Sequence, residues 1–68
     1  MFGAKQWPEL VGQTFQQASY AILAFDNSLH PYNARHGMEN RMFDPKRVVC
    51  VTNDYDIVTK PPSYMYRN

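Results

Sequence analysis

The chain has 68 residues, of which 44% are hydrophobic and 15% aromatic, and its formal net charge is +1. This length predicts one domain, residues 1–68, which buries only about 60% of the surface that the unfolded chain exposes. Lys and Arg are dispersed along the sequence, so there is no basic patch for nucleic acid or for an anionic membrane surface.

The chain offers no covalent or metal reinforcement. Cys50 is the single cysteine, so no intrachain disulfide can form, and we expect it to be a small buried hydrophobe. His30 and His36 lack an acidic partner at ligand spacing, so we expect no metal and no cofactor. No apolar run is long enough to span a bilayer, and the N-terminus lacks the layout of a secretory signal. If Met1 is the natural start, we expect a cytoplasmic protein without a membrane partner.

The first half of the chain predicts an anchor, a turn and a helix. Residues 1–6 are expected to form an N-terminal arm, and Trp7 is expected in the core. Gly12 permits a sharp turn. Thr14 is a favourable N-cap, and Gln17 completes a capping-box pattern. We predict a helix from about Thr14 to Ala24. Apolar residues at helical spacing would form its buried stripe: Phe15, Ala18 and Ile22.

The middle of the chain predicts a poor strand followed by a long loop. From Leu29 to Arg35 we expect an edge-like or partly irregular strand, because Pro31 removes a backbone donor and Asn33 is a poor strand former. The stretch from His36 to Lys46 has no sustained period and has breakers near both ends, which predicts an exposed loop. Loops of this length are usually functional.

The last third predicts two strands and a tail. Arg47 to Thr52 is apolar and β-branched on both faces, as expected for the central strand of a small sheet covered by a helix. Residues 53–56 should form a turn. Ile57 to Thr59 can return as a short strand that Pro61-Pro62 terminates. Residues 63–68 are then expected to be a polar and aromatic tail.

Several of these segments occur together in a known family. They are the Trp7-Pro8-Glu9-Leu10-Val11-Gly12 segment, the capped helix with Ala18, the Arg47-Val48 strand start and the closing strand from Ile57 to Pro61. In these features the chain resembles the potato inhibitor I family of serine-protease inhibitors, over roughly Trp7 to Pro62. The resemblance implies an α+β fold, with a single helix packed on a small mixed sheet and a long exposed binding loop between two strands.

The resemblance also implies that this loop enters a protease active site. The implied reactive loop comprises Gly37, Met38, Glu39, Asn40, Arg41, Met42, Phe43 and Asp44. Counting back from Arg47, the residue that fills the enzyme's primary pocket is Arg41, whereas counting forward from Gly12 gives Met42. We prefer Arg41, because the downstream strand matches the family better than the segment before the loop.

In the family, arginines and their acceptors brace the loop from the sheet below. In this chain, Asn40, Met42 and Asp44 stand at positions where the family usually has other residues of this network. Arg47 is the one supporting residue of the network that this chain retains. Glu39 or Asp44 could pair with Arg47 in a rewired brace. A loop without any brace would be cleaved as a substrate.

Two functions therefore stay open. The first is a substrate-like inhibitor of a trypsin-like or subtilisin-like serine protease, with Arg41 in the primary pocket. The alternative is a non-inhibitory interaction module of the same fold, which docks into a larger protein assembly through the loop and the aromatic tail. An enzyme is not expected, because no acid/base pair, activated nucleophile or phosphate loop can be assembled from these residues. We favour the inhibitor because of the resemblance.

Overall fold

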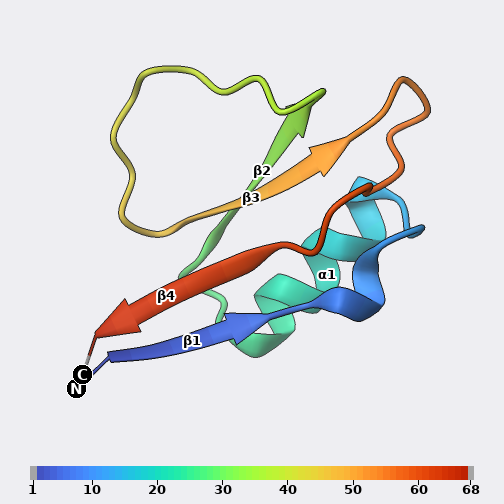
Figure 1. Ribbon diagram of the computed structural model, residues 1–68. Helices are drawn as coiled ribbons and strands as arrows, with labels where there is room; N and C mark the ends of the chain where they lie inside the picture. The colour runs from blue at the N-terminus through green and yellow to red at the C-terminus, as the bar shows by residue number, and fades with distance from the viewer. Residues whose placement is uncertain (1, 68) are drawn as a thin grey trace.

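A computed structural model describes residues 2–67 of the chain (Figure 1). Strands β2 and β3 pair in parallel, and β1 and β4 pair antiparallel, so both kinds of pairing occur but in two separate two-stranded sheets. The predicted α+β class is confirmed. In chain order, the elements are β1 (Phe2–Gln6), a 3-10 helix (Pro8–Leu10), α1 (Phe15–Phe25), β2 (His30–Arg35), β3 (Arg47–Thr52) and β4 (Ser63–Arg67).

The predicted helix is present with its predicted cap. Thr14 Oγ1 accepts a hydrogen bond from Gln17 N at 3.1 Å, and Gln17 Oε1 accepts one from Thr14 N at 2.9 Å. These two bonds satisfy backbone donors that have no partner inside the helix. The chain reaches the cap through Gly12, whose φ of 91° lies in the region that glycine adopts without strain. The helix ends at Phe25, one residue beyond the predicted end.

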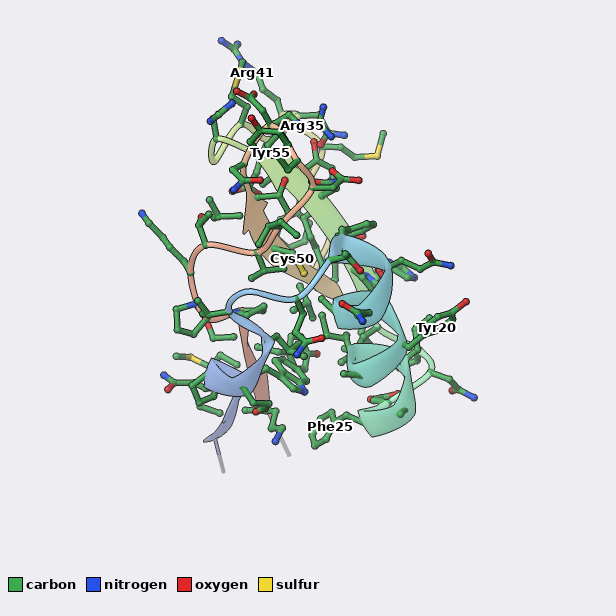
Figure 2. The ribbon with its side chains drawn as sticks, turned by 90° about the vertical axis from the view of Figure 1, so that its right-hand side faces the viewer. Tyr20, Phe25, Arg35, Arg41, Cys50 and Tyr55 are labelled. Carbon is green, nitrogen blue, oxygen red and sulfur yellow. The ribbon has the colours of Figure 1, made fainter. Side chains whose placement is uncertain are left out.

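One hydrophobic core lies between α1 and the strands. Its buried members are Trp7, Leu10, Ala18, Ile22, Leu29, Val48, Cys50 and Val58. The helix contributes Ala18 and Ile22, as its apolar stripe predicted, and β3 contributes every second residue. Cys50 is fully buried near the centre of Figure 2, and this burial raises the pKa of its thiol to about 11. The thiol is therefore protonated at neutral pH and acts as a small hydrophobe.

Replacing Trp7 by Ala should lower the free energy of unfolding by about 3–5 kcal/mol. The indole is only 3% exposed, and its ring meets that of Phe25 edge to face with centroids 5.6 Å apart. Urea denaturation measures the loss. Tyr20→Ala is the matched control, because this ring lies on the outer face of α1 (Figure 2) and its removal should cost less than about 0.5 kcal/mol. Equal losses in the two variants would contradict the core position of Trp7.

The sequence predicted an edge-like or partly irregular strand from Leu29 to Arg35, and β2 is an edge strand that is regular from His30 to Arg35. His30 N donates to Lys46 O, and just beyond the strand His36 N donates to Thr52 O, both at 2.8 Å. In a parallel pair, the backbone N–H and C=O groups of only every second residue point toward the neighbouring strand. The backbone nitrogen of Pro31 consequently points away from β3, and the proline costs no hydrogen bond of the ladder.

Three predictions about β-structure are wrong. Strand β3 belongs to a two-stranded sheet with β2, and on its other side it has only an isolated bridge, so it is not the central strand of a larger sheet. Residues 57 and 58 form only isolated bridges to Thr14 and Thr52, and not a strand. The predicted arm and tail form β1 and β4, in register from Phe2 opposite Arg67 to Gln6 opposite Ser63. Residues 1 and 68 of the arm and the tail lie outside the described residues. The pairing joins opposite ends of the sequence, so no local pattern predicts it.

Candidate functional site

Residues 36–46 form a wide exposed loop between β2 and β3, at the upper left of Figure 1. This confirms the predicted loop from His36 to Lys46. Because β2 and β3 are parallel, the loop leaves one end of the sheet and returns to the other end. Its chain therefore runs back along the sheet, where side chains from both strands can reach it.

The loop starts with a tight turn that directs the chain away from β2. His36 and Gly37 both have positive φ, 56° and 81°. Gly37 N donates to Ala34 O at 2.9 Å, and Met38 N donates to Arg35 O at 3.1 Å. A positive φ costs a residue such as His about 1 kcal/mol or more, so the surrounding hydrogen bonds must hold it. The His36 ring adds a contact of its own, with Nε2 2.7 Å from Asp54 Oδ1.

Asn40 fastens the middle of the loop to both strands of the sheet. Its backbone N donates to the hydroxyl of Tyr32 on β2 at 2.9 Å. Its side-chain Oδ1 accepts from Arg47 Nη2 on β3 at 2.8 Å and from Met42 N at 3.2 Å. Asn40 thereby holds the backbone on both sides of Arg41, through its own backbone N before Arg41 and through its side chain at Met42 N after it.

Arg47, the residue predicted as the loop support, contacts two residues of the loop from β3. Its side chain is only 11% exposed, its guanidinium carbon stacks 4.2 Å from the ring centre of Tyr32, and Nη1 lies 3.5 Å from Glu39 Oε1. A planar guanidinium can stack and donate in several directions at once, which a lysine cannot do. Of the two acids that the sequence offered, Glu39 is the ion-pair partner of Arg47. The brace of the loop is therefore rewired, through Glu39, Asn40 and Tyr32.

Asp44 closes the end of the loop with a different partner. Its Oδ2 lies 2.8 Å from His30 Nδ1, and its Oδ1 accepts from Lys46 N at 2.9 Å. The hydrogen bond with His30, and then the one from Lys46, lower the pKa of the Asp44 carboxyl. The sequence predicted no acidic partner at ligand spacing for either histidine, yet each contacts one aspartate in the fold. These partners are distant in sequence, so local spacing could not reveal them.

Acid should loosen this end of the loop. Because the folded-state pKa of Asp44 is lowered, the stabilisation by its carboxylate is complete above the ordinary value of 3.8 and is lost as the pH falls through the folded-state value. In an NMR titration we expect the carboxyl of Asp44 to titrate below 3.8, together with the amide of Lys46. Asp44→Asn should remove the pH dependence of that amide. A midpoint at or above the ordinary value would contradict the hydrogen bonds.

The remaining side chains at the tip of the loop point outward. Arg41 lies at the outermost end of the molecule in Figure 2, and its guanidinium has no hydrogen-bond or ion-pair partner among the side chains of residues 3–65 or the described backbone. Its apolar neighbours are also free, since Met38 is 75%, Met42 72% and Phe43 87% exposed. The predicted loop residues therefore form two groups. The side chains of Glu39, Asn40 and Asp44 are held by hydrogen bonds or ion pairs, whereas those of Met38, Arg41, Met42 and Phe43 are exposed and available for contact.

The described part of the chain contains neither a membrane-spanning helix nor a group of metal ligands. No helix within residues 2–67 is long and apolar enough to cross a membrane. Within the same residues, no three His, Cys, Asp or Glu side chains are grouped as ligands for a metal ion.

Comparison with known proteins agrees with this geometry. The model of the potato inhibitor I family matches residues 2–64, and the chain belongs to this family. Its structure is similar to the crystal structure of bitter gourd trypsin inhibitor, with a TM-score of 0.76 and 26% sequence identity over 91% of this chain and 94% of that chain. No curated protein matches the chain. Family and fold support serine-protease inhibition as the function, with a protease as the partner, and the interaction module is not favoured.

Proposed function

We propose that the chain is a substrate-like inhibitor of a trypsin-like serine protease, with Arg41 in the primary specificity pocket. The observation that carries the proposal is an unpaired, exposed arginine between two positions that Asn40 holds in place. A long cationic side chain suits a pocket with a carboxylate at its base, where it forms a charge-assisted hydrogen bond. The similar structure from bitter gourd is that of a trypsin inhibitor, which supports this choice of enzyme.

The hydrogen bond from Met42 N to Asn40 Oδ1 favours Arg41 over Met42 as the pocket residue. When the oxygen of the catalytic serine attacks the Arg41 carbonyl carbon, an ester forms and the bond to Met42 N breaks. The hydroxyl proton of the serine passes through the histidine of the enzyme to that nitrogen, which leaves as an amine. Asn40 lies on the other side of the cut and holds the amine close. The amine can then attack the ester and restore the peptide bond. Among the described residues, Phe43 N has no such tether, so a cut after Met42 lacks this route back.

The brace makes this loop an inhibitor and not a substrate. Ordering one backbone residue costs about 1–2 kcal/mol, so a loop that is ordered before binding loses far less free energy when it docks. The fastening of the loop to Tyr32 and Arg47 supplies this order. A rigid loop also resists the motion that would carry the leaving amine away from the enzyme.

The test is titration of trypsin with the purified chain, followed by mass spectrometry of the complex over time. We expect stoichiometric inhibition and a slow cut between Arg41 and Met42 that does not go to completion. Subtilisin, run in parallel, should be inhibited less because it lacks a carboxylate at the base of its pocket. Rapid and complete cleavage without inhibition would overturn the proposal, whereas a cut between Met42 and Phe43 would move the pocket residue to Met42.

A further inference from the structure

The structure describes three methionines, and all three expose their side chains. Met38 is 75%, Met42 72% and Met65 74% exposed. The first two lie in the reactive loop, on either side of Arg41, and the third lies on β4. Because dissolved oxidants reach an exposed thioether, each of these sulfurs is open to conversion into a sulfoxide.

The single thiol of the chain is protected from the same oxidants. Cys50 is fully buried in the core, and this burial raises the pKa of its thiol to about 11. The thiolate is the reactive form of a cysteine, so Cys50 is inert at neutral pH. Figure 2 shows Cys50 inside the molecule, whereas Arg41, the neighbour of Met42 in the chain, lies at the outermost end. The described sulfurs that an oxidant can reach are therefore those of the methionines.

Met42 differs from the other two methionines because its nitrogen belongs to the proposed scissile bond. That nitrogen donates to Asn40 Oδ1 at 3.2 Å, which holds Met42 beside the bond. When Arg41 fills the pocket, the side chain of Met42 comes to lie against the enzyme on the leaving-group side. Phe43 follows it and is 87% exposed, so the loop presents two adjacent apolar side chains there. Such a pair suits a contact from which water is excluded.

We propose that Met42 is a modification site at which oxidation by a peroxide weakens the inhibitor. This proposal rests on the proposed function. The sulfur attacks one oxygen of the peroxide and forms an S–O bond, while the O–O bond breaks. The other oxygen leaves with the bonding electrons and takes up the proton of the attacked oxygen, so that hydrogen peroxide yields water. The sulfur is thereby oxidised by two electrons to a sulfoxide, and the peroxide is reduced.

The sulfoxide should weaken binding without disturbing the fold. Its oxygen is a polar acceptor that stays in water as long as the chain is free, because Met42 is exposed and lies outside the core. In the complex, the same oxygen is removed from water at a contact that suits an apolar side chain. A polar group that loses water without gaining a donor destabilises the bound state.

The experiment measures binding to trypsin whose catalytic serine is replaced by alanine, so that cleavage of the loop cannot affect the result. The chain is treated with hydrogen peroxide, which is removed before mixing, and mass spectrometry of peptides identifies the oxidised residues. We expect oxidation of Met42 to raise the dissociation constant about tenfold. Met42→Leu keeps the size and the apolar character of the side chain, so after the same treatment its dissociation constant should rise less than about twofold.

A complementary variant keeps Met42 and removes the other two described methionines. Met38→Leu/Met65→Leu should still show the rise of about tenfold on oxidation. Met1 is present in both variants, so it cannot account for a difference between them. A response that persists in Met42→Leu, or one that disappears in the complementary variant, would overturn the assignment to Met42. Methionine sulfoxide reductases should restore binding.

The outcomes also separate this proposal from the proposed function. If the untreated chain binds, and the chain oxidised at Met42 binds within about twofold of it, the modification site is wrong and the proposed function stands. If the untreated chain does not bind, the proposed function fails and the modification site fails with it. Thermal unfolding before and after treatment is the remaining control. A lower unfolding temperature after oxidation would place the damage in the fold and would contradict an effect at the contact.

Discussion

Arg41→Ala should raise the inhibition constant for trypsin by at least about a hundredfold. An arginine buried at the centre of an interface is often worth more than about 2 kcal/mol, and here its removal also leaves the carboxylate of the enzyme pocket without a partner. The fold should not change, because the side chain is exposed and forms no hydrogen bond or ion pair with the described residues that it could lose. Inhibition assays with parallel thermal unfolding measure the two effects separately.

Two other variants make this result specific to the pocket. Lys46→Ala removes another exposed cation from the same loop and should leave the inhibition constant within about threefold of the original. Arg41→Leu should weaken inhibition of trypsin and strengthen inhibition of subtilisin, since the side chain at this position sets specificity. If Met42→Ala abolished inhibition while Arg41→Ala did not, the pocket residue would be Met42.

Arg47→Ala should turn the inhibitor into a substrate. The variant loses the charge-assisted hydrogen bond to Asn40 and the ion pair with Glu39, and each such hydrogen bond is worth about 1.5–3 kcal/mol. We expect trypsin to cut the Arg41–Met42 bond at least about tenfold faster, because a loop that is no longer braced releases its leaving amine. Time courses followed by mass spectrometry give the rate of the cut.

The partners of Arg47 should contribute unequally. Glu39→Gln should have the smaller effect, because this ion pair is longer, at 3.5 Å, and the acid is 42% exposed. Arg47→Lys keeps the charge but loses the planar group that stacks on Tyr32, so it should rescue only part of the inhibition. Lys60→Ala removes an exposed cation far from the loop in sequence and is the control. Unchanged cleavage in Arg47→Ala would show that the brace does not govern the loop.

The helix and the bounds of the loop could be predicted because their signals are local. The cap residues Thr14 and Gln17 lie three residues apart, and the apolar stripe repeats at the helical period. Strands β1 and β4 could not be predicted in the same way. Each is short, and each is stabilised by a partner at the other end of the chain, so neither carries a complete signal of its own.

The site was predicted in part for a similar reason. The sequence pointed to Arg47 as the support but left Glu39 and Asp44 open, because only the path of the loop decides which acid comes close. It missed Tyr32 and His30. Register could have indicated Tyr32, since it lies opposite Val49, on the same face of the sheet as Arg47. That inference needs the pairing of β2 with β3, which the sequence alone does not give.

The pairing of strands in the two sheets also determines whether the two pieces stay together after a single cut in the loop. β2 pairs with β3, and β1 pairs with β4, so each ladder joins a strand before Arg41 to a strand after Met42. The core is shared in the same way, with Ile22 on the first piece and Val48 on the second. Two synthetic peptides, residues 1–41 and 42–68, should therefore be unstructured when separate and should recover helical circular dichroism when mixed. Both sheets would therefore continue to join the two pieces after a cut at the proposed scissile bond between Arg41 and Met42.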